Sequence, residues 1–251
     1  MSRGEKISEP SRETGVGDHA DAESQWGLKV ISWALLISLG SVVLSAAVAV
    51  VLRAVIPRDP GFTSYFFFLT LPTSLLSATS AIVFLLGFAT VYRHRGEAGR
   101  ARDRNLRRSL VLLVATVVAT LLSSSVLFFW PFLLPSLGVP ELRGIQATLS
   151  LVFGGADIIV SLLLALLLYY TVVSFLPAGL LSRLNIAVIL LILGAVVSFA
   201  LALVSVWTAQ SLQEFDDYFF ALTALAVVLF WSVFRASARS LGRPSSPSPE
   251  T

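Results

Sequence analysis

The chain has 251 residues, of which 56% are hydrophobic and 13% are charged, and its formal net charge is +3. A soluble domain has about 25% charged residues. This composition, with a mean hydropathy of +0.84, therefore excludes an ordinary water-soluble fold and indicates a protein of a lipid bilayer. The sequence contains no cysteine, which excludes disulfide bonds, thiol chemistry and thiolate metal sites.

Apolar runs separated by charges and prolines predict an all-α integral membrane protein with a bundle of six transmembrane helices in residues 26–235. A spanning helix needs about 20 mostly apolar residues, and each run is too long and too uniformly apolar for an alternating barrel strand. Polar residues 1–25 and 236–251 are expected to be disordered tails. The predicted spans, in chain order, are residues 30–52, 65–91, 109–130, 151–176, 184–207 and 218–234.

Small residues spaced three or four apart mark three of these spans. Apolar helices gain little by hiding from one another in lipid, and close backbone approach and hydroxyl hydrogen bonds decide their association. The stripes therefore predict helix–helix contacts. They are Ser41, Ser45 and Ala49 in the first span, Thr116, Thr120 and Ser124 in the third, and Gly194, Ser198 and Ala202 in the fifth.

The second span contains the polar sequence TLPTSLLSATS, residues 70–80. Its Pro72 is expected to kink the helix and to free a carbonyl, an arrangement that some transporters use at a binding site. Thr70 and Ser74 are therefore candidate groups of an intramembrane polar site. The alternative is a kinked helix without a ligand, whose hydroxyls serve helix packing.

The connection between the second and third spans is rich in arginine. Cytoplasmic loops of membrane proteins carry an excess of Lys and Arg, so this loop, the basic tails and the even number of spans predict that both termini are cytoplasmic. The loop is expected to attract anionic lipid headgroups, or alternatively a cytoplasmic partner. It lacks interleaved aromatic residues that would stack bases, so no nucleic acid is expected to bind. Its arginines are Arg93, Arg95, Arg100, Arg102, Arg104, Arg107 and Arg108.

The segment PFLLPSLGVP, residues 131–140, follows the third span. Proline lacks a backbone donor and clashes with the preceding turn of a helix. We therefore expect the third helix to end here and the segment to lie along the outer interface as a loop.

Asp157 is the only Asp, Glu, Lys or Arg inside the predicted spans. A charged Asp at a helix centre costs about 2.5–3.5 kcal/mol on insertion scales, so a deep carboxyl group needs a partner or a proton. A helix that crosses at residues 151–171 submerges Asp157 by roughly 9 Å, at 1.5 Å per residue. A helix that crosses at residues 158–176 places it at the outer interface. Both alternatives remain open.

The candidate intramembrane site combines Asp157 with hydroxyl groups. Ser161 shares a helical face with Asp157, because the two are four residues apart. Thr116 and Thr120 of the third span would complete the site with the hydroxyls of the second. Its function would be proton or cation coupling, and the alternative is a structural hydrogen bond.

The predicted spans lack the residues that most kinds of catalytic chemistry need. The spans contain no histidine and only one carboxylate, which excludes a His-Glu-x-x-His zinc site, a Ser–His hydrolase and an aspartyl dyad. We expect no metal, no cofactor and no enzymatic activity. The sequence predicts a role in structure, in assembly of a homo-oligomer or membrane complex, or in membrane homeostasis. The alternative is a small transporter or channel subunit that uses Asp157.

Overall fold

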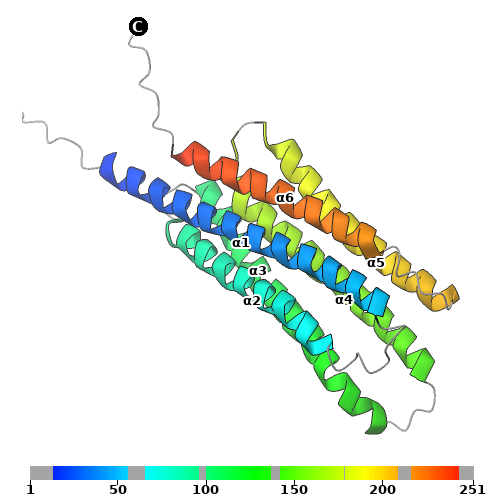
Figure 1. Ribbon diagram of the computed structural model, residues 1–251. Coiled ribbons are helices and arrows are strands. Elements are labelled where there is room, and N and C mark those ends of the chain that lie inside the picture. The colour runs from blue at the N-terminus through cyan, green and yellow to red at the C-terminus, as the bar shows by residue number, and fades with distance from the viewer. Residues whose placement is uncertain are drawn as a thin grey trace, which may run out of the picture.

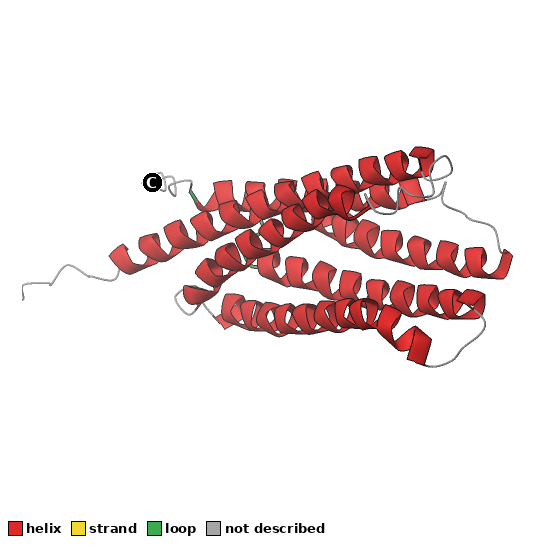
Figure 2. Ribbon diagram, turned by 60° about the horizontal axis from the view of Figure 1, so that its bottom comes forward, coloured by secondary structure: helices red, strands yellow, loops and turns green. Residues whose placement is uncertain are grey.

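The computed structural model describes residues 14–55, 66–95, 100–136, 142–177, 179–208 and 216–242. Every regular element in this part of the chain is an α-helix (Figure 2). Each of the six helices contains a segment long and apolar enough to cross a membrane, which confirms the predicted all-helical fold. The helices are α1 (Thr14–Val55), α2 (Phe66–Arg93), α3 (Arg100–Ser136), α4 (Leu142–Val173), α5 (Leu181–Thr208) and α6 (Asp216–Leu241) (Figure 1).

Two helices extend into segments that we expected to be disordered tails. Helix α1 begins at Thr14 and α6 continues to Leu241, so the expectation is wrong for residues 14–25 and 236–241. Both extensions are packed, since Ser24 and Ser237 are buried. Tertiary contacts, which a polar composition does not reveal, therefore hold these turns in place. Residues 1–13 and 243–251 lie outside the described residues.

Helix α3 continues through Pro131 and Pro135 to Ser136, so the loop expected at residues 131–140 is wrong for its first six residues. A proline removes one backbone donor and crowds the preceding turn, which bends a helix without necessarily ending it. Residues 137–140 lie outside the described part of the chain.

Helix α4 is longer at its start and shorter at its end than the predicted span 151–176. It ends at Val173, and the chain then turns with a hydrogen bond from the Phe175 N–H to the Val172 carbonyl, 2.9 Å long. Gly179 follows with a φ of 93°, a conformation that glycine adopts without steric cost. The continuous helix also crosses the Gly154–Gly155 pair without a break.

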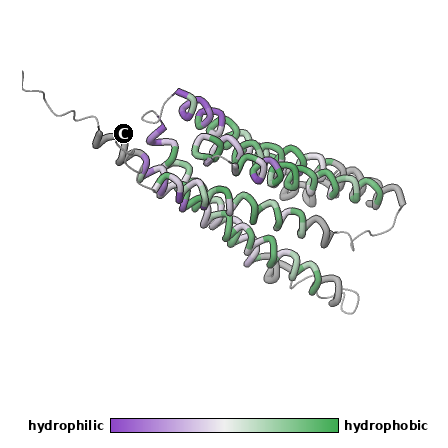
Figure 3. The backbone as a smooth tube through the Cα atoms, turned by 90° about the horizontal axis from the view of Figure 1, so that it is seen from above, coloured by the Kyte–Doolittle hydropathy of each residue, from purple (hydrophilic) through white to green (hydrophobic). Residues whose placement is uncertain are grey.

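The helices pack as an open row. Helix α1 lies between α2 and α6, α5 lies between α6 and α4, and α3 packs on α4. We use the name basic end for the end of the bundle that holds the first turns of α1, the α2–α3 connection, the α4–α5 connection and the last turns of α6. Hydrophilic residues gather at this end (Figure 3).

The hydrophobic core lies at the basic end. Wherever side chains are described, the buried ones lie in the half of each helix nearer that end or at its middle. The helices are closest together there and separate toward the opposite end (Figure 1). The core includes Leu28, Ile31 and Leu35 of α1, Phe88 and Val91 of α2, Leu106 of α3, Leu168 and Val172 of α4, Leu184, Ala187 and Leu191 of α5, and Phe230, Val233 and Phe234 of α6.

Candidate functional site

Asp103, on the first turn of α3, binds two arginines at the basic end. Its carboxylate lies 3.2 Å from Arg95, just beyond α2, and 2.9 Å from Arg107, one turn along α3. The guanidinium of Arg95 also lies 4.0 Å from the centre of the Tyr92 ring. The Arg95 ion pair therefore connects the end of α2 with α3, whereas the Arg107 ion pair lies within α3.

Arg102 connects three parts of the bundle. Its guanidinium donates to the carboxylate of Asp21 on α1 at 3.2 Å and lies 4.5 Å from the centre of the Phe175 ring, in the turn after α4. The side chain of Arg102 is only 17% exposed. A nearby hydrogen bond of 3.0 Å, from Asn105 to Ser174, joins α3 to the same turn.

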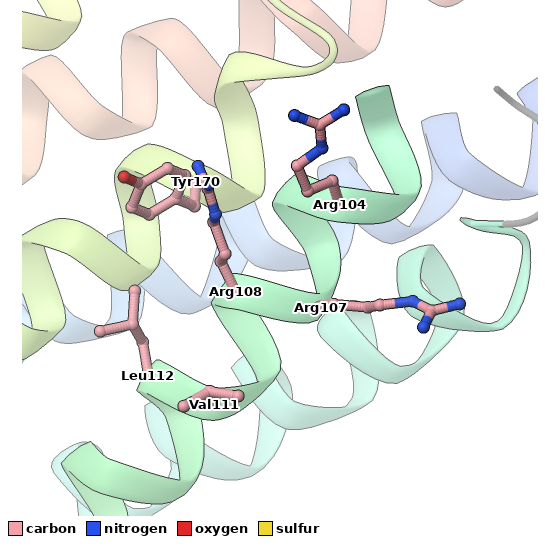
Figure 4. Close-up of a pocket in the computed structure, with 6 residues that line it drawn as sticks. All are labelled: Arg104, Arg107, Arg108, Val111, Leu112 and Tyr170. Atoms are coloured by element: carbon pink, nitrogen blue, oxygen red, sulfur yellow. The ribbon is translucent and has the colours of Figure 1, made fainter. Parts of the chain in front are cut away.

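Arg104 and Arg108 lie on a different side of α3 and line a groove of ≈ 510 Å³ (Figure 4). Arg108 extends beside Tyr170 of α4, with its guanidinium carbon 5.5 Å from the ring centre. Arg107 also borders the groove but extends away from Tyr170 (Figure 4). Within the described residues, Arg104 and Arg108 form no ion pair with a carboxylate.

The groove changes from basic to apolar along α3. Val111 and Leu112 line it beyond Arg108, about 4.5–6 Å farther along the helix at 1.5 Å per residue. Leu106 and Ser109, which are fully buried, occupy the opposite face of α3. The groove therefore opens on the outer surface of the bundle.

A second basic groove, of ≈ 260 Å³, lies between α1 and α6 at the same end. Arg235 lies 5.1 Å from the centre of the Trp231 ring. Both grooves thus place cations beside aromatic rings at the rim of the core. The second groove is lined by Lys29, Ser32, Trp33, Leu36, Trp231, Arg235, Ala238 and Arg239.

Ser74, the candidate hydroxyl of α2 whose side chain is described, faces α1. Ser74 lines a shallow groove of ≈ 500 Å³ with Ser41 and Ser45. The Ser41 hydroxyl donates to the Thr73 carbonyl at 3.1 Å and so joins α1 to α2 one residue beyond Pro72. The side chain of Thr70 lies outside the described part of the structure.

The other candidate residues lie on α3 and α4. The contacts of Arg108 with Tyr170 and of Asn105 with Ser174 set the register of these antiparallel helices. This register places Thr120 within about one turn of the level of Asp157. The register thus brings the α3 and α4 candidates to a similar level, while Ser74 of α2 lies against α1.

Asp157 is exposed, and Ser161 is half-buried. Leu168 lies eleven residues beyond Asp157, which is about 20° around a helix of 3.6 residues per turn. Leu168 is 3% exposed and belongs to the core. Asp157 therefore lies on the inner face of α4, in the region where the helices separate. Thr116 donates to the carbonyl of Leu112 on its own helix at 2.7 Å, and Thr120 is exposed.

Sequence reasoning identified the arginines but missed Tyr170, Asp103 and Asp21 as their partners. The i,i+4 spacing of Arg104 and Arg108, with the apolar Val111 and Leu112 three and four residues after Arg108, was the available signal for a helical face. Among the described residues, His, Cys, Asp and Glu form no group of three or more that could hold a metal ion. No model of a known family, no curated protein and no solved structure matches this chain.

Proposed function

We propose that this chain is a non-enzymatic multi-pass protein of the cytoplasmic membrane, with the basic end and both termini in the cytoplasm. Its role is structural, in the assembly of a membrane complex or in membrane homeostasis. The observation that carries this proposal is the chemistry of the core, where every buried polar side chain among the described ones is a hydroxyl: Ser24, Ser32, Ser109, Thr171 and Ser237.

Three of these hydroxyls bind their own helix. Ser32 donates to the Lys29 carbonyl at 2.7 Å, Ser109 to the Asn105 carbonyl at 3.1 Å and Thr171 to the Leu167 carbonyl at 2.7 Å. A hydroxyl that bonds the preceding turn is satisfied within its helix. This arrangement supports a core that serves packing, because each of these three hydroxyls is engaged with a backbone carbonyl of its own helix.

The proposed orientation rests on the charges and aromatic rings of the basic end. Arginine on the cytoplasmic side and aromatic residues at headgroup level are the two general markers of membrane orientation. Both markers coincide at Tyr92 with Arg95, Tyr170 with Arg108, and Trp231 with Arg235. If the inner headgroups of the membrane lie at the level of these three pairs, the hydrocarbon core would surround the apolar segments of all six helices.

A second candidate function, that of a small transporter or channel subunit, is favoured by the position of Asp157. Thirteen residues separate it from Tyr170, which is about 20 Å along a helix, while the hydrocarbon core is about 30 Å thick. With Tyr170 at the inner headgroups, Asp157 would lie about 10 Å from the outer surface of that core. An intramembrane carboxylate on the inner face of a helix is a candidate proton or cation site.

Proton and potassium flux in proteoliposomes separates the two functions. A structural protein is expected to leave the flux at the level of protein-free vesicles, both with the wild-type chain and with Asp157→Asn. A flux that the wild-type chain supports and Asp157→Asn abolishes would overturn the structural role in favour of transport.

Native gel electrophoresis tests assembly directly. We expect the chain, solubilised from its own membranes in a mild detergent, to migrate as part of a larger species. That species should be absent from protein dissociated in a harsh detergent. Migration as an isolated chain from its own membranes would contradict the assembly role.

A further inference from the structure

We propose that the groove formed by Arg104, Arg108, Tyr170, Val111 and Leu112 binds one anionic phospholipid, with the arginines on its phosphate and the apolar residues against an acyl chain. This inference deepens the proposed function, because it rests on the basic end lying at a leaflet of the membrane. It goes further than a general attraction of positive charge to headgroups, since it assigns the binding to two particular arginines.

The charge of the groove fits a phosphate. Arg104 and Arg108 are one helical turn apart, so their Cβ atoms are about 5–6 Å from each other, and both guanidiniums can donate to one phosphate group. Within the described residues no carboxylate neutralises either of them. Arg107 differs, because Asp103 binds it at 2.9 Å. Guanidinium–phosphate hydrogen bonds are charge-assisted and directional.

The depth and the facing of the groove fit a lipid better than a free anion. Val111 is 69% exposed on the outer surface of the bundle, where acyl chains would contact it. The apolar residues lie farther from the basic end than the arginines do, in the same order as the tail and head of a phospholipid. Basic pockets beside transmembrane helices on the cytoplasmic side are common sites for anionic headgroups.

Arg108 lies against an aromatic neighbour at the edge of the groove. Tyr170 borders the groove from α4 and holds the guanidinium of Arg108 at 5.5 Å from its ring centre (Figure 4). A guanidinium already placed by stacking loses less rotamer freedom when it binds a ligand. The α3–α4 pair therefore presents a partly pre-organised site.

The test measures lipid binding to the purified full chain in a neutral detergent, with dioleoyl phosphatidylglycerol, dioleoyl phosphatidylcholine and inorganic phosphate as separate probes. The variant Arg104→Gln with Arg108→Gln removes two charges from the groove. The matched control, Arg93→Gln with Arg100→Gln, removes two charges from exposed positions of the same end outside the groove. Circular dichroism and gel filtration confirm that both variants fold.

We expect phosphatidylglycerol to bind the wild-type chain and the control equally, and the groove variant about tenfold or more weakly. Phosphatidylcholine should bind all three weakly. Val111→Trp, which keeps both arginines, should also weaken phosphatidylglycerol binding because it fills the apolar part of the groove.

Three results would overturn the proposal. Equal losses in the groove variant and the control would leave only the general attraction of the basic end. Binding of inorganic phosphate that competes with the lipid and ignores Val111→Trp would make this a site for a free anion. Equal binding of phosphatidylglycerol and phosphatidylcholine to the wild-type chain would exclude selectivity for an anionic lipid. The assay is independent of orientation in the cell and of complex assembly, so its failure is distinguishable from failure of the proposed function.

Discussion

Gly27 of α1 and Gly87 of α2 face each other with no side chain between their backbones. A Cβ atom on Gly87 would lie 2.8 Å from the carbonyl oxygen of Gly27, and a Cβ atom on Gly27 would lie 2.9 Å from the carbonyl oxygen of Gly87. Ile31 and Val91, both fully buried, pack beside this contact. The closest approach of α1 and α2 therefore depends on the absence of two side chains.

Replacement of Gly87 by alanine should destabilise the protein by about 1–3 kcal/mol, because the added carbon meets backbone that cannot rotate away. Gly40→Ala is the matched control, since a Cβ atom there meets nothing within 4 Å. Thermal unfolding in detergent measures both. Equal midpoints for Gly87→Ala and the wild-type chain would show that the two helices are not in direct contact at this position.

This contact could not be predicted from the spacing of small residues. The stripe rule finds small residues that recur on one helix, such as Ser41 and Ser45, and these do lie against α2. Ser24 lies three residues before Gly27 and Thr90 three residues after Gly87, but neither pair extends to a third small residue at a spacing of three, and Gly27 precedes the predicted first span. Their meeting depends on the register of α1 against α2, which only the packed structure specifies.

Arg102 and Arg104 are two residues apart on α3 but differ in their contacts. Arg102 binds Asp21 and contacts the ring of Phe175, whereas Arg104 is exposed. Arg102→Gln is therefore expected to lower the free energy of unfolding by about 1–2 kcal/mol, through loss of a charged hydrogen bond and a cation–π contact. Arg104→Gln should change it by less than about 0.5 kcal/mol. Chemical unfolding of both variants in detergent provides the comparison, and similar losses would contradict the role assigned to Arg102.

The hydrogen bond from Asn105 to Ser174 joins α3 to the turn that follows α4. A double-mutant cycle with Asn105→Ala and Ser174→Ala should give a coupling energy of about 0.6 kcal/mol, the average for such bonds between membrane helices. The cycle isolates this pair from the other effects of each substitution. Strict additivity of the two single changes would show that the pair contributes nothing to stability.

Ser237 of α6 is fully buried, and its hydroxyl has no hydrogen-bond partner among the described residues. An unpaired buried hydroxyl is costly, so Ser237→Ala should leave stability unchanged or raise it by up to about 1 kcal/mol. Thr171→Ala, at an equally buried position, removes the hydroxyl that binds the Leu167 carbonyl and should destabilise. A loss of stability in Ser237→Ala comparable to that in Thr171→Ala would reveal a partner for the Ser237 hydroxyl.

The candidate intramembrane site shows where sequence reasoning reaches its limit. Helical periodicity correctly places Asp157 and Ser161 on one face of a single helix, because both positions follow from a local rule. The grouping of Ser74 with them required α2 to lie beside α4, and the order of helices in the row places α1, α6 and α5 between these two elements. Neighbour relations between helices come from their packing, which periodicity within one helix does not encode.

The orientation of the bundle can be tested with single cysteines, because the native chain has none. Ala101→Cys and Ser240→Cys lie at exposed positions of the basic end, and Ser211→Cys lies in the α5–α6 connection. If arginine holds the basic end in the cytoplasm, a membrane-impermeant maleimide should label only position 211 in intact cells. Positions 101 and 240 should react after permeabilisation. Labelling of position 101 in intact cells would show that the orientation is the reverse of the proposed one, with the arginine groove at the opposite leaflet.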